Sequence, residues 1–157
     1  MSAGGVSSET RSRLLTMNLV ACLLLLVQYL LGMVTNLFVT LPGRHPGAGA
    51  PDYFGGLVPA VAWIITQASI WAAVHAAFGL ALVVGAVVLA AIAVRLRMPT
   101  YAATAILGAL SVVGAAFNGA SFIMYGHDFS SMIMGGVWAL ALACYVAGLY
   151  LLARRPA

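Results

Sequence analysis

The stretch 14–41, LLTMNLVACLLLLVQYLLGMVTNLFVTL, contains 28 residues and no charged side chain. A helix needs about 20 consecutive apolar residues to cross the hydrocarbon core of a bilayer, so this stretch predicts a first membrane-spanning helix. Three further apolar runs follow at 59–94, 100–124 and 129–153. The pattern predicts an all-α integral membrane protein that forms a four-helix bundle as one domain over residues 1–157.

The composition agrees with this fold class and excludes others. Of the 157 residues, 64% are hydrophobic and 6% are charged, and the mean hydropathy is +1.08. Soluble domains are typically about 25% charged. A water-soluble globular enzyme, a nucleic-acid-binding protein and a disordered chain are therefore excluded, and the lipid bilayer is the expected surrounding.

The positions of the basic residues predict the orientation. All seven are arginines, and six of them lie before the first run, between the second and third runs, or after the fourth. Positive residues favour the cytoplasmic side. Both termini of this multi-pass cell-membrane protein are thus expected inside, and the connections near 42–58 and 125–128 are expected outside.

The run 59–94 is longer than one span requires. As a single helix its roughly 36 residues would extend about 54 Å, whereas the hydrocarbon core is about 30 Å thick. Either the helix projects outward, or it breaks before the span. The polar patch 66–69, Thr-Gln-Ala-Ser, favours the break.

Polar residues within the runs predict which helix faces meet. Such groups are costly in lipid and usually face the interior of a bundle. Helical spacing groups them with small and aromatic residues into four stripes: Gln28, Gly32 and Thr35; Gln67, Trp71, His75 and Gly79; Ser111, Gly114, Asn118, Ser121 and Tyr125; and Met134, Trp138, Ala141 and Tyr145. Small residues spaced four apart, such as Ala115 and Gly119, allow close packing within one chain or within a homo-oligomer.

The three histidines gather toward the outer side. His75 is the one histidine inside a predicted span, and it lies twenty residues before Arg95, or about 30 Å from the cytoplasmic boundary. His45 and His127 occupy the two outer connections. Since imidazole is the commonest metal ligand, this distribution predicts a haem or metal site at the outer end.

Two cofactors and one cofactor-free alternative fit these residues. For haem b, His75 would be one axial ligand, and His127, Met124, Met132 or Met134 the other, because haem iron accepts His/His and His/Met pairs. The other expected contacts are Gln28, Trp71 and Asn118 with the cofactor, and Arg44 with a propionate. The alternative is a membrane protein or oxidase that binds copper or another metal such as zinc at the outer face, and its ligands would be His75, His127 and His45 with Asp52 or Asp128. In the third alternative, the chain is an interaction subunit whose polar stripes only fix helix register.

Two short segments resemble haem A synthase. The segment 26–35, LVQYLLGMVT, is similar to that family's first-helix signature, in which a glutamine precedes a leucine-glycine pair. The segment 75–80, HAAFGL, resembles its following helix. The resemblance implies one four-helix half of that family, with His75 at the position of a haem ligand. The expected function is a haem b membrane redox protein, linked to quinol or to a respiratory complex; whether it is an enzyme stays open.

Overall fold

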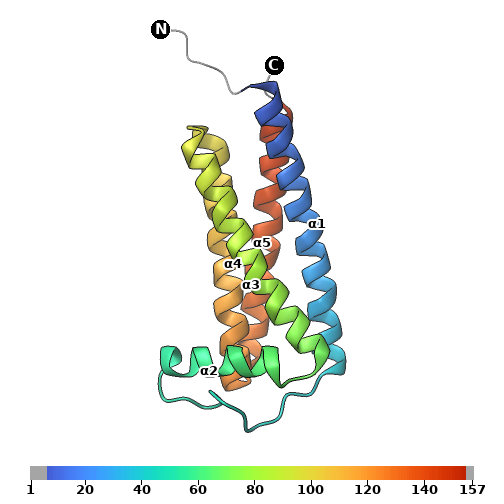
Figure 1. Cartoon of the computed structure of the whole chain (residues 1–157), viewed down its shortest axis with the longest axis vertical. Helices are drawn as coiled ribbons and strands as arrows, with labels where there is room; N and C mark the ends of the chain where they lie inside the picture. Colours follow the sequence, from blue (N-terminus) through green and yellow to red (C-terminus); the bar gives the residue numbers. More distant parts are fainter. Residues whose placement is uncertain (1–6, 155–157) are drawn as a thin grey trace.

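The computed structural model describes residues 7–154, which form five α-helices and no strand. They are α1 (Ser8–Phe38), α2 (Tyr53–Thr66), α3 (Ile70–Arg95), α4 (Pro99–Tyr125) and α5 (Asp128–Ala153). The helices α1, α3, α4 and α5 are long and apolar enough to cross a membrane, and they stand side by side in Figure 1. This confirms the all-α class and the four candidate spans, and it suggests a multi-pass protein in contact with lipid.

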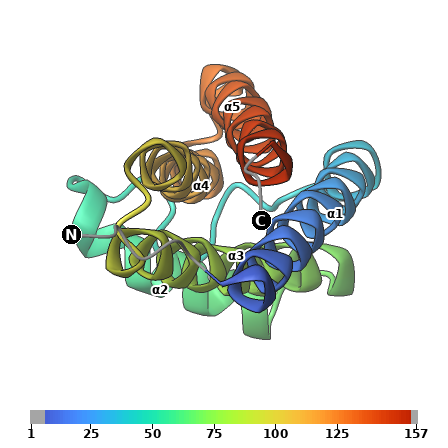
Figure 2. The same cartoon turned by 90° about the horizontal axis from the view of Figure 1, so that it is seen from above.

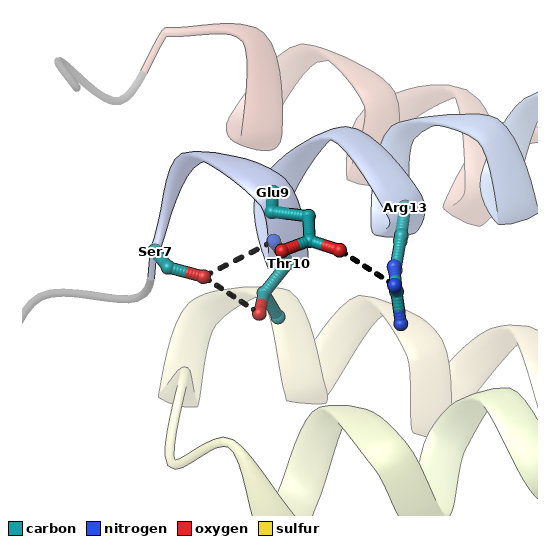
Figure 3. A network of polar contacts seen from close by, with 4 residues as sticks. All are labelled: Ser7, Glu9, Thr10 and Arg13. Atoms are coloured by element: carbon teal, nitrogen blue, oxygen red, sulfur yellow. Dashed lines mark hydrogen bonds and ion pairs between the residues drawn. The ribbon is translucent and has the colours of Figure 1, made fainter.

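The first helix begins with a side-chain cap. The Ser7 hydroxyl accepts a hydrogen bond from the main-chain N–H of Thr10 at 3.2 Å, and so satisfies one of the free donors of the first turn. One turn further, Arg13 and Glu9 form an exposed ion pair at 2.6 Å (Figure 3). Exposed pairs of this kind add little stability, so the cap and the apolar surface define α1.

The long apolar run 59–94 is divided between α2 and α3. The division falls at residues 67–69, where the Ser69 hydroxyl caps α3 by accepting from the N–H of Ala72 at 3.4 Å. Figure 1 shows that α2 crosses the end of the bundle instead of extending α3. Of the two possibilities for this run, the structure therefore shows the break at the polar patch.

The four long helices form a ring. Its order is α1, α3, α4, α5, and each helix packs against its two neighbours in this order. Within residues 7–154 the main chains of the diagonal pairs, α1 with α4 and α3 with α5, do not approach each other closely, so these pairs can meet only through side chains. Figure 2 shows the ring from the end that carries the chain termini. What occupies the centre of the ring differs between its two ends.

At the end that carries the termini, the centre is filled. Asn18 of α1 is fully buried, and its amide donates to the Leu14 carbonyl at 2.9 Å and to the Tyr101 hydroxyl of α4 at 2.6 Å. Gly148 of α5 lies so close that a Cβ there would be 2.8 Å from Asn18 Oδ1. The absence of a side chain at Gly148 is what lets α5 approach α1 here.

At the opposite end, α2 and the connection before it cover the ring. The His45 ring stacks on Trp63 of α2 with centroids 4.2 Å apart. The N–H of Gly49 donates to the Met124 carbonyl at 2.9 Å, and the Tyr53 hydroxyl donates to the Phe117 carbonyl at 2.7 Å. These contacts anchor both the connection and α2 to α4.

Candidate ligand-binding cavity

A cavity of about 1020 Å³ lies in the half of the ring next to α2. All four long helices line it, together with α2 and the connection before α2. Cavities that hold small molecules or cofactors typically measure about 300–1,000 Å³, so this one is large enough for a cofactor. The tightly packed half of the bundle and this open half are thus distinct regions of one ring.

All four predicted stripes contribute to the cavity wall, the α4 stripe through Tyr125 alone. The predicted stripe residues that line it are Gln28, Gly32, Thr35, His75, Gly79, Tyr125, Met134 and Trp138. Glycines of all four long helices also line the cavity, and they leave space beside the polar groups. The helical spacing of the polar residues therefore predicted the inner faces of α1, α3 and α5.

His75 lies at the contact between α1 and α3. A Cβ on Gly32 would be 3.1 Å from the His75 Cε1, so the imidazole rests against the bare backbone of α1. Its Nδ1 is buried and has no hydrogen-bond partner. Because buried polar atoms are nearly always paired, this nitrogen needs an explanation.

Gln28 approaches His75 from α1. Its Nε2 donates to the His75 main-chain carbonyl at 3.1 Å, and Gly79 makes room for the amide, since a Cβ there would lie 3.0 Å from that nitrogen. The other amide atom, Oε1, is buried without a partner. The same helix contact thus contains an unpaired acceptor and an unpaired imidazole nitrogen.

The other two histidines also line the cavity, but differently from His75. The exposed ring of His127 stacks with Tyr125 and Phe129, with centroids 6.1 and 5.1 Å apart. In His45, Nδ1 lies 3.0 Å from the Pro46 carbonyl oxygen and Nε2 lies 3.1 Å from that of Ile123. A ligand would therefore have to displace a main-chain contact to reach either nitrogen of His45.

Three predicted contact residues lie elsewhere. Trp71 is 50% exposed and Arg44 is exposed, and neither lines the cavity. Asn118 does not line it either, and its amide donates to the Gly114 carbonyl of its own helix at 2.9 Å. The structure thus brings Gln28 and the three histidines to one cavity and leaves these three outside it.

Tyr29 and Met33 of α1 are cavity residues that the sequence did not single out. The Tyr29 ring stacks with Trp138 of α5 at a centroid distance of 5.0 Å. Their four-residue spacing, next to the polar stripe, is compatible with an inward-facing position. Aromatic and methionine residues on lipid-facing surfaces give the same spacing, so the sequence alone does not identify them as cavity residues.

Residues 7–154 contain no group of three or more His, Cys, Asp and Glu side chains that could hold a metal ion. The copper or zinc alternative therefore has no assembled ligand set in this part of the chain. Haem makes a smaller demand, since one or two side chains suffice as axial ligands.

The helices and the cavity indicate a class: four helices long and apolar enough to cross a membrane, which suggest a multi-pass membrane protein, surround a cavity at one end of the bundle. No protein-family model, curated protein or solved structure matches the chain. The residues that line the cavity are therefore the basis for a functional proposal.

Proposed function

We propose that the protein binds haem b in this cavity and acts as a membrane redox protein, with His75 as an axial ligand. The observation that supports the proposal best is an imidazole, with a buried unpaired nitrogen, in the wall of a large and mainly apolar cavity. Bundle cores suit haem because side chains from facing helices converge there.

The chemistry of the His75 contact fits a ligand role. A histidine that binds a metal through Nε2 carries a proton on Nδ1, and this N–H is normally held by an oxygen acceptor. Gln28 Oε1 is an acceptor without a donor at the same helix contact. Gln28 would therefore orient the imidazole and fix the tautomer that leaves Nε2 free for iron.

Met134 is the favoured second ligand. It lines the cavity from α5, which lies diagonally opposite α3 in the ring, and Gly119 gives its sulfur room. Met124 also lines the cavity but is buried against Gly56 of α2, and Met132 is 73% exposed and does not line the cavity. His127 is the alternative, since its ring lines the outer end.

Bound haem would supply one-electron exchange. The arginine distribution supports an orientation with both termini in the cytoplasm, which would place the cavity in the outer half of the membrane. We propose quinol as the electron donor and an acceptor outside the membrane, such as a respiratory complex.

The test is an optical spectrum of the purified protein after reconstitution with haemin, together with metal analysis. We expect a Soret band and a reduced α-band in the wild type, and their loss in His75→Ala. Trp71→Phe is the matched control, since this residue lies one turn earlier on α3 and outside the cavity. It should retain the wild-type spectrum.

Two results would overturn the proposal. One is a wild-type protein that takes up no haem after reconstitution, and the other is an unchanged spectrum in His75→Ala. Copper or zinc near one equivalent, without haem, would favour the metal alternative instead. In Met134→Leu, a shifted α-band and lower reduction potential would identify the second ligand, because methionine ligation raises the potential.

A further inference from the structure

We infer that the cavity opens sideways into the bilayer between α1 and α5, and that its ligand enters from the lipid through this opening. The identity of the ligand, haem b, rests on the proposed function. The opening itself rests on the arrangement of the two helices and on the residues along their facing edges.

The two helices diverge toward the α2 end. In both views (Figures 1 and 2) the cyan part of α1 and the orange part of α5, next to α2, lie apart, whereas nearer the termini Asn18 of α1 lies against Gly148 of α5. The hydrogen bonds between them agree with this view. Arg11 donates to the Leu152 and Ala153 carbonyls near the termini, and the Trp138 indole donates to the Leu25 carbonyl at 3.0 Å.

The stacked pair Tyr29 and Trp138 marks the point where the helices separate. Its ring centroids are 5.0 Å apart. In the described part of the chain, no side-chain hydrogen bond joins α1 and α5 beyond this pair in the direction of α2. The pair therefore forms the inner limit of the opening.

Beyond this pair, residues on both helices line the cavity and are also exposed. They are Met33 on α1, with 39% of its surface exposed, and Gly135 on α5. Both belong to helices long and apolar enough to span a membrane. An opening in that position faces acyl chains, and it admits a flat apolar molecule that is already dissolved in the bilayer.

The cavity also reaches the outer connection, where Thr40 and Gly126 line it. That side is tied down by the Gly49 bond to α4 and by the contact of the Tyr125 hydroxyl with the Ala50 carbonyl at 3.3 Å. The lateral side has no comparable tie among the described residues. We therefore infer that the ligand enters by the lateral route.

Two adjacent glycines supply a matched test. A Cβ on Gly135 or on Gly136 would meet no atom within 4 Å, so a larger side chain fits at either position without a clash. Gly135 lines the cavity and Gly136 does not. A leucine at Gly135 would obstruct the opening, whereas a leucine at Gly136 would point into the surrounding lipid.

The experiment measures haem loading in proteoliposomes. Haemin dissolved in separate vesicles of the same phosphatidylcholine is mixed with apoprotein vesicles, and the growth of the Soret band is followed over time. Gly135→Leu should slow loading severalfold and reach the wild-type haem content at equilibrium. Gly136→Leu should load at the wild-type rate. Equal rates in the two variants would overturn the lateral route while leaving haem binding intact.

A second measurement does not depend on haem. In a Trp63→Phe, Trp71→Phe background, Trp138 is the remaining tryptophan, and lipids with brominated acyl chains should quench its fluorescence. Gly135→Leu should protect it and Gly136→Leu should not; equal quenching would overturn the opening even if no haem binds. If Gly135→Leu does not fold, Ser131→Leu replaces it, since Ser131 lines the cavity one turn away.

Discussion

Gly148→Ala should destabilise the protein although alanine is the better helix former. The added Cβ would lie 2.8 Å from Asn18 Oδ1 and 3.3 Å from Tyr101 Cε2. Asn18 cannot easily move away, because it is fully buried and its amide is held by the Leu14 carbonyl and the Tyr101 hydroxyl. Helix α5 would therefore have to shift away from α1 and α4.

The size of the effect follows from three contributions. Overpacking of a filled core costs about 1–3 kcal/mol. Distortion of the hydrogen bond between Asn18 and Tyr101 adds about 1 kcal/mol. Replacing glycine by alanine within a helix returns about 1 kcal/mol. We expect the free energy of unfolding to fall by about 1–3 kcal/mol.

The assay is reversible unfolding of the purified protein in mixed micelles, followed by the loss of helicity. Gly85→Ala is the control, because Gly85 lies within α3 and a Cβ there would meet no atom within 4 Å. It should be as stable as the wild type or slightly more stable. If Gly148→Ala unfolds at the same denaturant fraction as Gly85→Ala, α1 and α5 do not pack as closely as described.

Three further predictions concern a contact in the cavity wall and two contacts at the start of the neighbouring helix α2. Trp138→Phe keeps an aromatic ring but loses the bond to the Leu25 carbonyl, so it should lower the free energy of unfolding by about 1 kcal/mol in the same micelle assay. Asp52→Ala removes the α2 cap, in which the carboxylate accepts from the Gly55 N–H at 2.6 Å; hydrogen exchange within α2 should rise, with α4 unchanged. Burial, and secondarily a neighbouring tyrosine, raises the pKa of the Tyr53 hydroxyl. The neutral Tyr53 hydroxyl should therefore contribute its full share to the free energy of unfolding below the ordinary tyrosine pKa of about 10. This contribution should be lost as the pH rises above that value and through the higher pKa of the folded protein. Thermal unfolding of Tyr53→Phe should show a weaker loss over that alkaline range.

The four long helices and part of the cavity wall could be predicted because the bilayer imposes simple rules. Apolar length gave the four long helices, and the cost of polar groups in lipid placed Gln28 and His75 on inner faces. The polar patch also marked the end of α2. That α2 lies across the bundle could not be predicted, since its direction depends on contacts such as His45 with Trp63.

Trp71 was predicted to contact the cofactor, but it lies outside the cavity for a geometric reason. Trp71 and His75 are four residues apart, and four residues turn an α-helix by about 400°, so the two side chains diverge by about 40°. Near the start of α3 this rotation directs the indole outward, where it is 50% exposed.

The two halves of the ring are coupled through α1 and α5. Close approach at Gly148 brings the helices together near the termini, and the bulky pair of Tyr29 and Trp138 separates them further along. The separation leaves cavity walls without packing partners, and such walls lose dispersion contacts. Packing around Asn18 must therefore stabilise the whole bundle when the cavity holds no ligand.

A ligand that binds only the folded protein would add stability that increases with its affinity and concentration. Haem loading and resistance to unfolding should consequently rise together, and His75→Ala should remove the gain that haem confers while leaving the closely packed half unchanged.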